Sequence, residues 1–220
     1  MPRVFITGSA DGLGRATART LLDDGHEVVV HARSGERLAA VDELLDRGAV
    51  PVAGDLADLE QTRHVAEQVN GLGRMDAVIH NAGVYTGRTT LPVNVVAPYL
   101  LTALIERPQR LVFLTSGMHR GGQADLAGMD WTGRSVTGSY SDSKLFVATL
   151  SATVRLRARL TLARIPHRSV AFPRDRRGAG AVRGHTGGYE TSPTVRIGET
   201  YLANPSLHEV RQALAAIAPQ

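Results

Sequence analysis

Short apolar runs alternate with longer stretches of helical spacing through the first 150 residues of the chain. We predict strands at residues 3–6, 27–31, 50–53, 77–80 and 111–115. We predict helices at residues 13–24, 35–47, 59–70, 92–105 and 139–158. This alternation indicates an α/β fold: a three-layer, Rossmann-type, doubly wound parallel sheet in a single domain, with right-handed crossovers.

The pattern changes after about residue 154. Residues 155–200 are rich in Arg and Gly, and order returns in a helix that we predict over residues 204–218. Ser206 and Glu209 form a capping box at the start of that helix. An apolar stripe follows at Leu207, Val210, Leu214 and Ile217. We therefore expect one domain over residues 1–220, with a Rossmann-type core at 1–154.

Composition narrows the class of protein. A chain of 220 residues is long enough to bury a substantial core. It has no cysteine, which excludes disulfides and thiolate catalysis, and its eight histidines lack metal-binding spacing, so no metal is expected. No apolar run is long enough to span a membrane, and the first residues show no signal pattern. A cytoplasmic protein without membrane contact is expected.

A glycine-rich turn, T-G-S-A-D-G-L-G at residues 7–14, lies between the first strand and the first helix. Gly8 permits a tight turn, Gly12 lets the backbone approach a pyrophosphate, and Gly14 allows close packing of helix on strand. The helix N-terminus then offers free N–H groups to phosphates. The turn indicates a dinucleotide site, and the alternative is a plain strand-to-helix turn.

The only lysine of the chain is the second notable feature. Of 25 basic side chains, 24 are Arg, and Lys144 stands four residues after Tyr140, on the same helix face. A phenol is a weak acid–base catalyst at neutral pH unless a neighbouring cation stabilises its phenolate. Arginine is bulkier and never deprotonates, so a lone lysine here favours catalysis. The alternative is an ordinary surface pair on a helix.

The T-G-x-x-x-G-x-G spacing, taken with Tyr-x-x-x-Lys, resembles the short-chain dehydrogenase/reductase family. Further matches follow in the family's order and cover residues 3 to about 150: Asp55-Leu56 after the third strand, Asn81-Ala82-Gly83 after the fourth, Asn94 in the next helix and Ser116 after the fifth. The resemblance implies a hydride transfer between nicotinamide and a carbonyl or alcohol carbon.

The resemblance also implies roles for particular residues. Tyr140 would be the general acid/base, Lys144 would assist it and bind the nicotinamide ribose, and Ser116 would hold the substrate oxygen. Asn94 would position a relay water. The implied cofactor-binding residues are Gly8, Ser9, Asp11, Gly12, Leu13, Gly14, Arg33, Asp55, Leu56, Asn81, Ala82, Gly83, Tyr140 and Lys144.

The residues after the second strand favour NADP(H) over NAD(H). Residues 31–34 read H-A-R-S, with no carboxylate for the ribose hydroxyls of NAD. Arg33 can pair with a 2′-phosphate, and Arg15 can add to this pairing. The alternative is that Arg33 begins a solvated helix with Glu36 and Arg37.

Two segments depart from the family pattern. A Gly-rich insert between Ser116 and Tyr140 holds the only Trp, Trp131, and resembles the retinol-dehydrogenase branch, which implies a hydrophobic carbonyl substrate. Met118, Met129 and Trp131 either line an apolar pocket or pack the loop. Only 13 positions separate Asn81 from Asn94, so the helix of Asn94 is shortened, with Pro92 in its first turn. That helix belongs to the family's dimer interface, so a homodimer stays open.

The third departure is the basic segment 155–184, which holds nine Arg and one acid. A sixth strand is expected at residues 169–172, but Arg174 stands where the family has Gly. The segment is a substrate lid, a basic patch for an acidic partner, or a degenerate stretch. Nucleic acid is not expected as a partner, because aromatic residues are scarce there.

The sequence as a whole favours an NADP(H)-dependent oxidoreductase acting on a small carbonyl or alcohol compound. The alternative is a catalytically impaired dinucleotide-binding protein with a binding or regulatory role, which would keep the fold but lack a complete substrate site.

Overall fold

The computed structural model describes residues 1–123, 125–166, 194–197, 199–203 and 205–217. The chain divides into two compact units, residues 1–147 and 148–220, and each is described by itself. One domain over residues 1–220 stays a prediction. The expected sixth strand at 169–172 lies outside the described residues, as does most of the basic segment.

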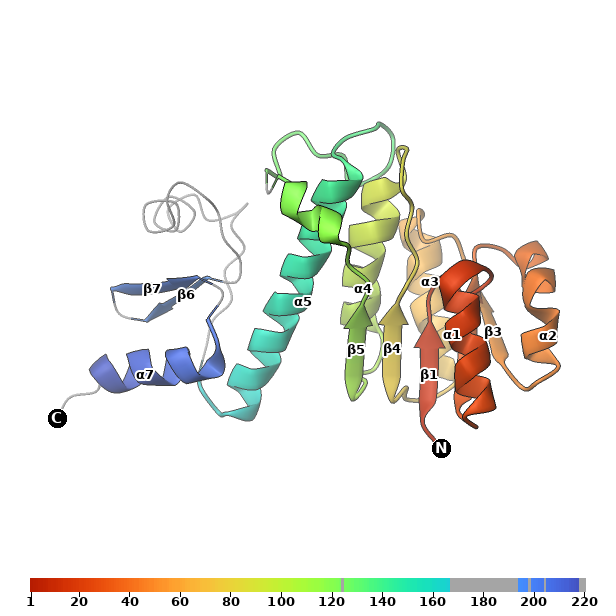
Figure 1. Ribbon diagram of the computed structural model, residues 1–220, viewed down its shortest axis with the longest axis horizontal. Helices are drawn as coiled ribbons and strands as arrows, with labels where there is room; N and C mark the ends of the chain where they lie inside the picture. Colours follow the sequence, from red (N-terminus) through yellow and green to blue (C-terminus); the bar gives the residue numbers. More distant parts are fainter. Residues whose placement is uncertain (124, 167–193, 198, 204, 218–220) are drawn as a thin grey trace. The chain divides into compact units, whose positions relative to one another are not determined.

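A five-stranded parallel sheet forms the centre of the first unit (Figure 1). Its strand order is β3-β2-β1-β4-β5, so the chain reverses its direction of travel across the sheet between β1 and β4. The strands are β1 (Arg3–Ile6), β2 (Glu27–Ala32), β3 (Val50–Ala53), β4 (Ala77–His80) and β5 (Arg110–Phe113). The predicted α/β class and parallel sheet are confirmed, and ligands of such sheets bind beyond the carboxyl ends of the strands, near such a reversal.

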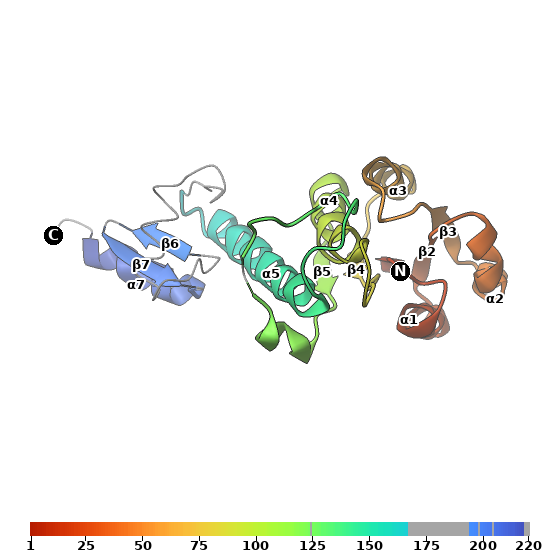
Figure 2. The same ribbon diagram turned by 90° about the horizontal axis from the view of Figure 1, so that it is seen from above.

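Helices connect these strands close to the predicted positions. They are α1 (Gly12–Asp23), η1 (Glu36–Val41), α2 (Asp42–Leu45), α3 (Leu59–Gly71), η2 (Pro92–Val96), α4 (Ala97–Leu104), η3 (Gly117–Gly121) and α5 (Tyr140–Leu162). Figure 2 shows α3 and α4 on one side of the sheet and α1 on the other. The three-layer arrangement is therefore confirmed.

Two predicted helices differ in kind from the expectation. Residues 35–47 form a 3₁₀ helix, η1, and then a single α-helical turn. Their apolar residues Leu38, Val41 and Leu44 recur every third residue, which suits three residues per turn. The helix predicted over 92–105 begins with the π-helix η2, and Pro92 lies in its first turn as expected.

Successive residues of a strand point to opposite faces of the sheet, and apolar side chains on both faces form two separate cores. Helices cover both faces for this reason. Phe5 and Val29 belong to the cluster packed beneath α3 and α4. Ile6 and Val30, the next residues along the same strands, belong to the cluster beneath α1 and α2. The near-continuous apolar runs of these strands thus lead to a sheet buried on both sides.

The second unit contains most of α5, an antiparallel hairpin of β6 (Thr194–Ile197) and β7 (Thr200–Ala203), and α7 (Leu207–Ile217). Its small core consists of Leu156, Leu160, Ile197 and Val210. The predicted capping box is confirmed, because Ser206 Oγ accepts from the Glu209 N–H at 3.2 Å and the Ser206 N–H donates to Glu209 Oε2 at 2.7 Å. The hairpin was not predicted.

None of the helices in the described part of the chain combines the length and the apolar character that crossing a membrane requires.

Candidate active site

A cavity of about 360 Å³ lies at the carboxyl ends of β1 to β4, and its size is that of a small-molecule site. The glycine turn, the ends of β2 and β3, the loop after β4 and the start of the next helix form its walls. The lining residues are Gly8, Ala10, Asp11, Leu13, His31, Arg33, Arg37, Asp55, Leu56, Ala57, Asn81, Ala82, Gly83, Val84, Thr89 and Val93. Ser9, Gly12, Gly14, Tyr140 and Lys144, also predicted to bind cofactor, lie outside this lining.

The backbone of the glycine turn is shaped so that a ligand can come close to it. Gly8 and Gly12 have φ of +62° and +51°, which favours glycine at both positions. A Cβ on Gly14 would lie 2.5 Å from the carbonyl oxygen of Gly8, so only glycine lets α1 begin so near the turn. No described atom outside its own neighbourhood lies within 4 Å of a Cβ built on Gly12, so the backbone there is open to a ligand.

The loop Asn81-Ala82-Gly83 is held directly against this turn. Thr7 Oγ1 accepts hydrogen bonds from the N–H groups of Asn81 and Ala82, both at 3.0 Å. Asn81 Nδ2 donates to the carbonyl oxygens of Thr7 and Gly8, both at 2.9 Å. A Cβ on Gly8 would lie 2.9 Å from Ala82 Cα. The two motifs therefore form one rigid wall of the cavity.

A buried group of side chains connects this wall to α5. Asn94 Oδ1 accepts from the Val84 N–H at 2.7 Å, and its Nδ2 donates to Val84 O and to Ser143 Oγ, both at 2.9 Å. Lys144 Nζ donates to Leu114 O at 2.9 Å. Burial lowers the pKa of Lys144. A Cβ built on Gly83 would lie 3.6 Å from both Asn94 Oδ1 and Lys144 Nζ, so the structure brings these two groups together.

Tyr140 and Ser116 lie at the same edge of the sheet. Tyr140 is the first residue of α5, and its ring centre is 5.4 Å from Lys144 Nζ and 4.8 Å from the ring centre of Tyr85. Ser116 follows β5, precedes η3 and accepts from the Met118 N–H at 3.3 Å. Its neighbour Thr115 donates through Oγ1 to Lys144 O at 3.4 Å, which joins the end of β5 to α5.

The first part of the chain, residues 2–105, matches the sequence model of the family described as short chain dehydrogenase. An uncharacterized oxidoreductase of Emericella nidulans is 39% identical over 154 residues, which cover 64% of this chain and 58% of that protein. The short-chain dehydrogenase chyC of Penicillium rubens is 40% identical over 171 residues, which cover 71% of this chain and 66% of that protein. The chain belongs to the short-chain dehydrogenase family.

A solved structure supports the fold of this short-chain dehydrogenase. The blue fluorescent protein from a metagenomic library, in complex with NADPH, has a TM-score of 0.55 and 27% identity, and the similarity covers 73% of this chain and 69% of that chain. This chain spans 58% and 66% of the lengths of the two curated relatives above.

The charged groups at the cavity differ from the expected set. Arg33 lines the cavity and is exposed, and Arg37, which also lines it, pairs with Asp11 at 3.1 Å. Arg15, which we expected to add to a phosphate site, instead pairs with Glu43 at 3.1 Å, as does Arg19 at 2.9 Å. The second basic side chain of the cavity is therefore Arg37.

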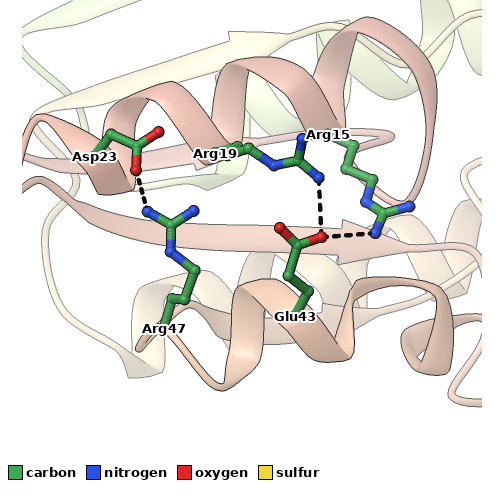
Figure 3. A network of polar contacts seen from close by, with 5 residues as sticks. All are labelled: Arg15, Arg19, Asp23, Glu43 and Arg47. Carbon is green, nitrogen blue, oxygen red and sulfur yellow. Dashed lines mark hydrogen bonds and ion pairs between the residues drawn. The ribbon is translucent and has the colours of Figure 1, made fainter.

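Figure 3 shows the ion pair that Arg15 makes with Glu43. Arg15 and Arg19 are one turn apart on α1 and both converge on Glu43 of α2, while Asp23 of α1 pairs with Arg47 just after α2. These exposed pairs align the two helices on one face of the sheet and contribute modestly to stability.

Three further residues that shape the site were not predicted from the sequence, and each has at least one partner distant in the sequence. Thr7 joins the glycine turn to the loop after β4, as described above. His31 lies in the cavity wall and bonds both the glycine turn and the end of β3. Asp142 accepts from the N–H groups of Gln123 and Ser139 at 2.6 and 2.7 Å. The position of His31 after the second strand could have drawn attention to it, and Ser139 and Asp142 have the S-x-x-D spacing of a capping box.

The insert before Tyr140 packs partly against the protein. The Trp131 ring lies 5.5 Å from the Phe146 ring, and Met129 Sδ would be 2.9 Å from a Cβ on Gly138. Packing of the loop, the alternative to a pocket, thus accounts for both residues. Met118, next to Ser116, is exposed instead.

Replacing Asp142 with Asn is expected to lower the free energy of unfolding by about 1–3 kcal/mol, because an amide cannot accept all the bonds that the carboxylate accepts at the start of α5. Urea unfolding followed by circular dichroism measures this. Asp125→Asn, in the same loop, is the control: the carboxylate is exposed and accepts one local bond at 2.8 Å. Equal stability of the two variants would contradict the role given to Asp142.

Proposed function

We propose that the chain is an NADP(H)-dependent oxidoreductase that transfers a hydride between nicotinamide and a carbonyl or alcohol carbon, with Tyr140 as general acid/base. The observation that carries this proposal is the position of Lys144. The only ammonium side chain of the sequence is buried, fixed by Leu114 O at 2.9 Å and 5.4 Å from the Tyr140 ring. Burying a lysine costs free energy, which is consistent with a catalytic use.

The residues of the cavity fit a dinucleotide. The backbone at Gly12 is open to a pyrophosphate. Helix α1 begins at the same residue, so the positive end of its dipole would face the phosphates. The cavity is lined by Arg33, Asp55, Leu56, Asn81 and Gly83. The exposed Arg33 and Arg37 favour a 2′-phosphate, hence NADP(H), and the solved relative described above binds NADPH.

When bound, the nicotinamide supplies or accepts the hydride. In the direction of reduction, Tyr140 would donate the proton of its hydroxyl to the substrate oxygen as the carbon receives the hydride, and in oxidation it would take that proton back. Lys144 would stabilise the phenolate left on Tyr140, and Ser116 would donate a hydrogen bond to the substrate oxygen where negative charge develops.

The hydrogen bonds of Asn94 define what it can do in a proton relay. Both of its N–H groups are engaged, on Val84 O and Ser143 Oγ, and Oδ1 accepts one bond from the Val84 N–H. The second acceptor position of Oδ1 would take a bond from a water. Asn94 would thus hold a relay water and also fix the loop after β4.

A hydrophobic carbonyl compound is the substrate class that we infer. Tyr85 packs against the Tyr140 ring yet keeps 62% of its surface exposed, and Met118 is exposed two residues after Ser116. An apolar substrate would cover these side chains on binding, which releases water from apolar surface. A homodimer stays a prediction.

Titration of the purified chain with NADPH and NADH, followed by nicotinamide fluorescence, tests the proposal. Micromolar NADPH binding with weaker NADH binding is expected, followed by NADPH oxidation with some members of an aldehyde and ketone panel. Binding without turnover of any compound would favour the catalytically impaired alternative. Failure to bind either dinucleotide would overturn the proposed function.

A further inference from the structure

We propose that His31 is a positioning residue whose neutral imidazole holds the glycine turn in its binding shape, so that dinucleotide affinity falls when the ring gains a second proton. The inference rests on the proposed function, because it concerns the affinity of the same cavity. His31 would not react with the cofactor or substrate; it would act through the backbone of Gly8.

His31 joins the ends of three neighbouring strands. Its ring Nδ1 accepts from the Gly8 N–H at 3.0 Å, and its ring Nε2 donates to Gly54 O at 2.9 Å. Its own N–H donates to Ser9 Oγ at 2.7 Å, and its carbonyl accepts from the Ser9 N–H at 3.0 Å. The glycine turn after β1, β2 itself and the residue after β3 are thus connected through one side chain, which is 4% exposed.

Only one form of the ring can make both ring bonds. An acceptor at Nδ1 and a donor at Nε2 define the neutral tautomer that carries its proton on Nε2. A second proton would turn Nδ1 into a donor facing the Gly8 N–H, and the two N–H groups would repel. Gly8 would then have to move or leave its N–H unsatisfied, which is costly for a buried backbone donor.

The surroundings of the ring favour its neutral form. Burial lowers the pKa of His31 below 6.5, while the hydrogen bond to Gly54 O and the charge of Asp55 act in the opposite direction. The other charged groups of the cavity are Asp11, Arg33 and Arg37. Because the folded-state pKa is depressed, the stabilising arrangement is complete above pH 6.5 and is lost as the pH falls through the lower folded value.

A comparison of the wild type with two variants, His31→Ala and His31→Asn, distinguishes this positioning role from a general contribution of His31 to stability. His31→Ala removes the acceptor for Gly8, and we expect its affinity for NADP⁺ at pH 8 to fall about tenfold, the equivalent of one hydrogen bond. His31→Asn carries an oxygen near the place of Nδ1 and does not titrate. At pH 8 we expect His31→Asn to bind NADP⁺ within about threefold of wild type. On acidification toward about pH 5.5 we expect its affinity to rise relative to that of the wild type, because only the wild-type ring gains a proton.

Isothermal titration calorimetry with NADP⁺ between about pH 5.5 and pH 8 gives the affinities. The ratio of the wild-type to the His31→Asn dissociation constant cancels the titration of the ligand's own phosphate. We expect this ratio to rise on acidification. His80→Asn is the matched control: His80 is also buried at a strand end, but bonds Thr102 at 3.0 Å and lies outside the cavity lining. The ratio of the wild-type to the His80→Asn dissociation constant is expected to stay constant with pH.

A ratio that does not change with pH, or full affinity of His31→Ala at pH 8, would overturn the role of His31. If His31→Ala does not fold, the pH dependence of the wild-type to His31→Asn ratio decides by itself. Absence of NADP⁺ binding by the wild type at pH 8 would instead refute the proposed function, so the two failures are distinct.

Discussion

Replacing Tyr140 with Phe is expected to lower kcat for carbonyl reduction by about 10²- to 10⁴-fold, while the dissociation constant for NADPH stays unchanged. The change removes one oxygen, the proposed proton donor. It keeps the ring, whose centre lies 4.8 Å from that of Tyr85 and 5.4 Å from Lys144 Nζ. Binding and turnover should therefore separate. Fluorescence titration measures the first, and NADPH oxidation with a carbonyl compound that the wild type reduces measures the second.

Tyr99→Phe is the control for this experiment, because Tyr99 is an exposed tyrosine of α4 outside the site. Its kcat is expected to match that of the wild type. Full turnover by Tyr140→Phe would exclude Tyr140 as the acid/base. A large loss of NADPH affinity in the same variant would show that the hydroxyl serves binding rather than proton transfer.

Replacing Arg33 with Ala is expected to weaken NADPH binding by about 1.5–3 kcal/mol, or roughly 10- to 150-fold, since one charged hydrogen-bonding partner of the 2′-phosphate is lost. NADH lacks that phosphate, so its affinity should change little. Arg33 lines the cavity and is exposed, and a bound phosphate would reach it without rearrangement of the protein core. Parallel titrations with the two dinucleotides measure the difference.

Arg19→Ala removes the same charge from α1, where the side chain pairs with Glu43 and stands outside the cavity lining. At physiological ionic strength its effect on NADPH binding should be small, because distant charges are screened. Equal losses for NADPH and NADH in Arg33→Ala would contradict the assignment of Arg33 to a 2′-phosphate. Equal losses in both arginine variants would point to net charge alone.

Local pattern was sufficient for most of the first unit. The strands and α1 were predicted closely because each buries its own apolar run, and a run is visible without its partners. Gly8, Gly12 and Gly14 could be interpreted for the same reason, since positive φ and close packing restrict a position to glycine whatever lies beyond it. The capping box at Ser206 is also a property of four consecutive residues.

Tertiary structure decided what depends on partners far along the chain. The sequence alone determined the α/β class, the glycine turn and the pairing of Tyr140 with Lys144, because these follow from spacing within single elements. It could not show that Arg37 rather than Arg15 faces the cavity, since Arg15 is drawn to Glu43 only once α1 and α2 pack side by side. Nor could it show that His31 bonds Gly8, because that bond forms only when β1 and β2 lie side by side in the sheet.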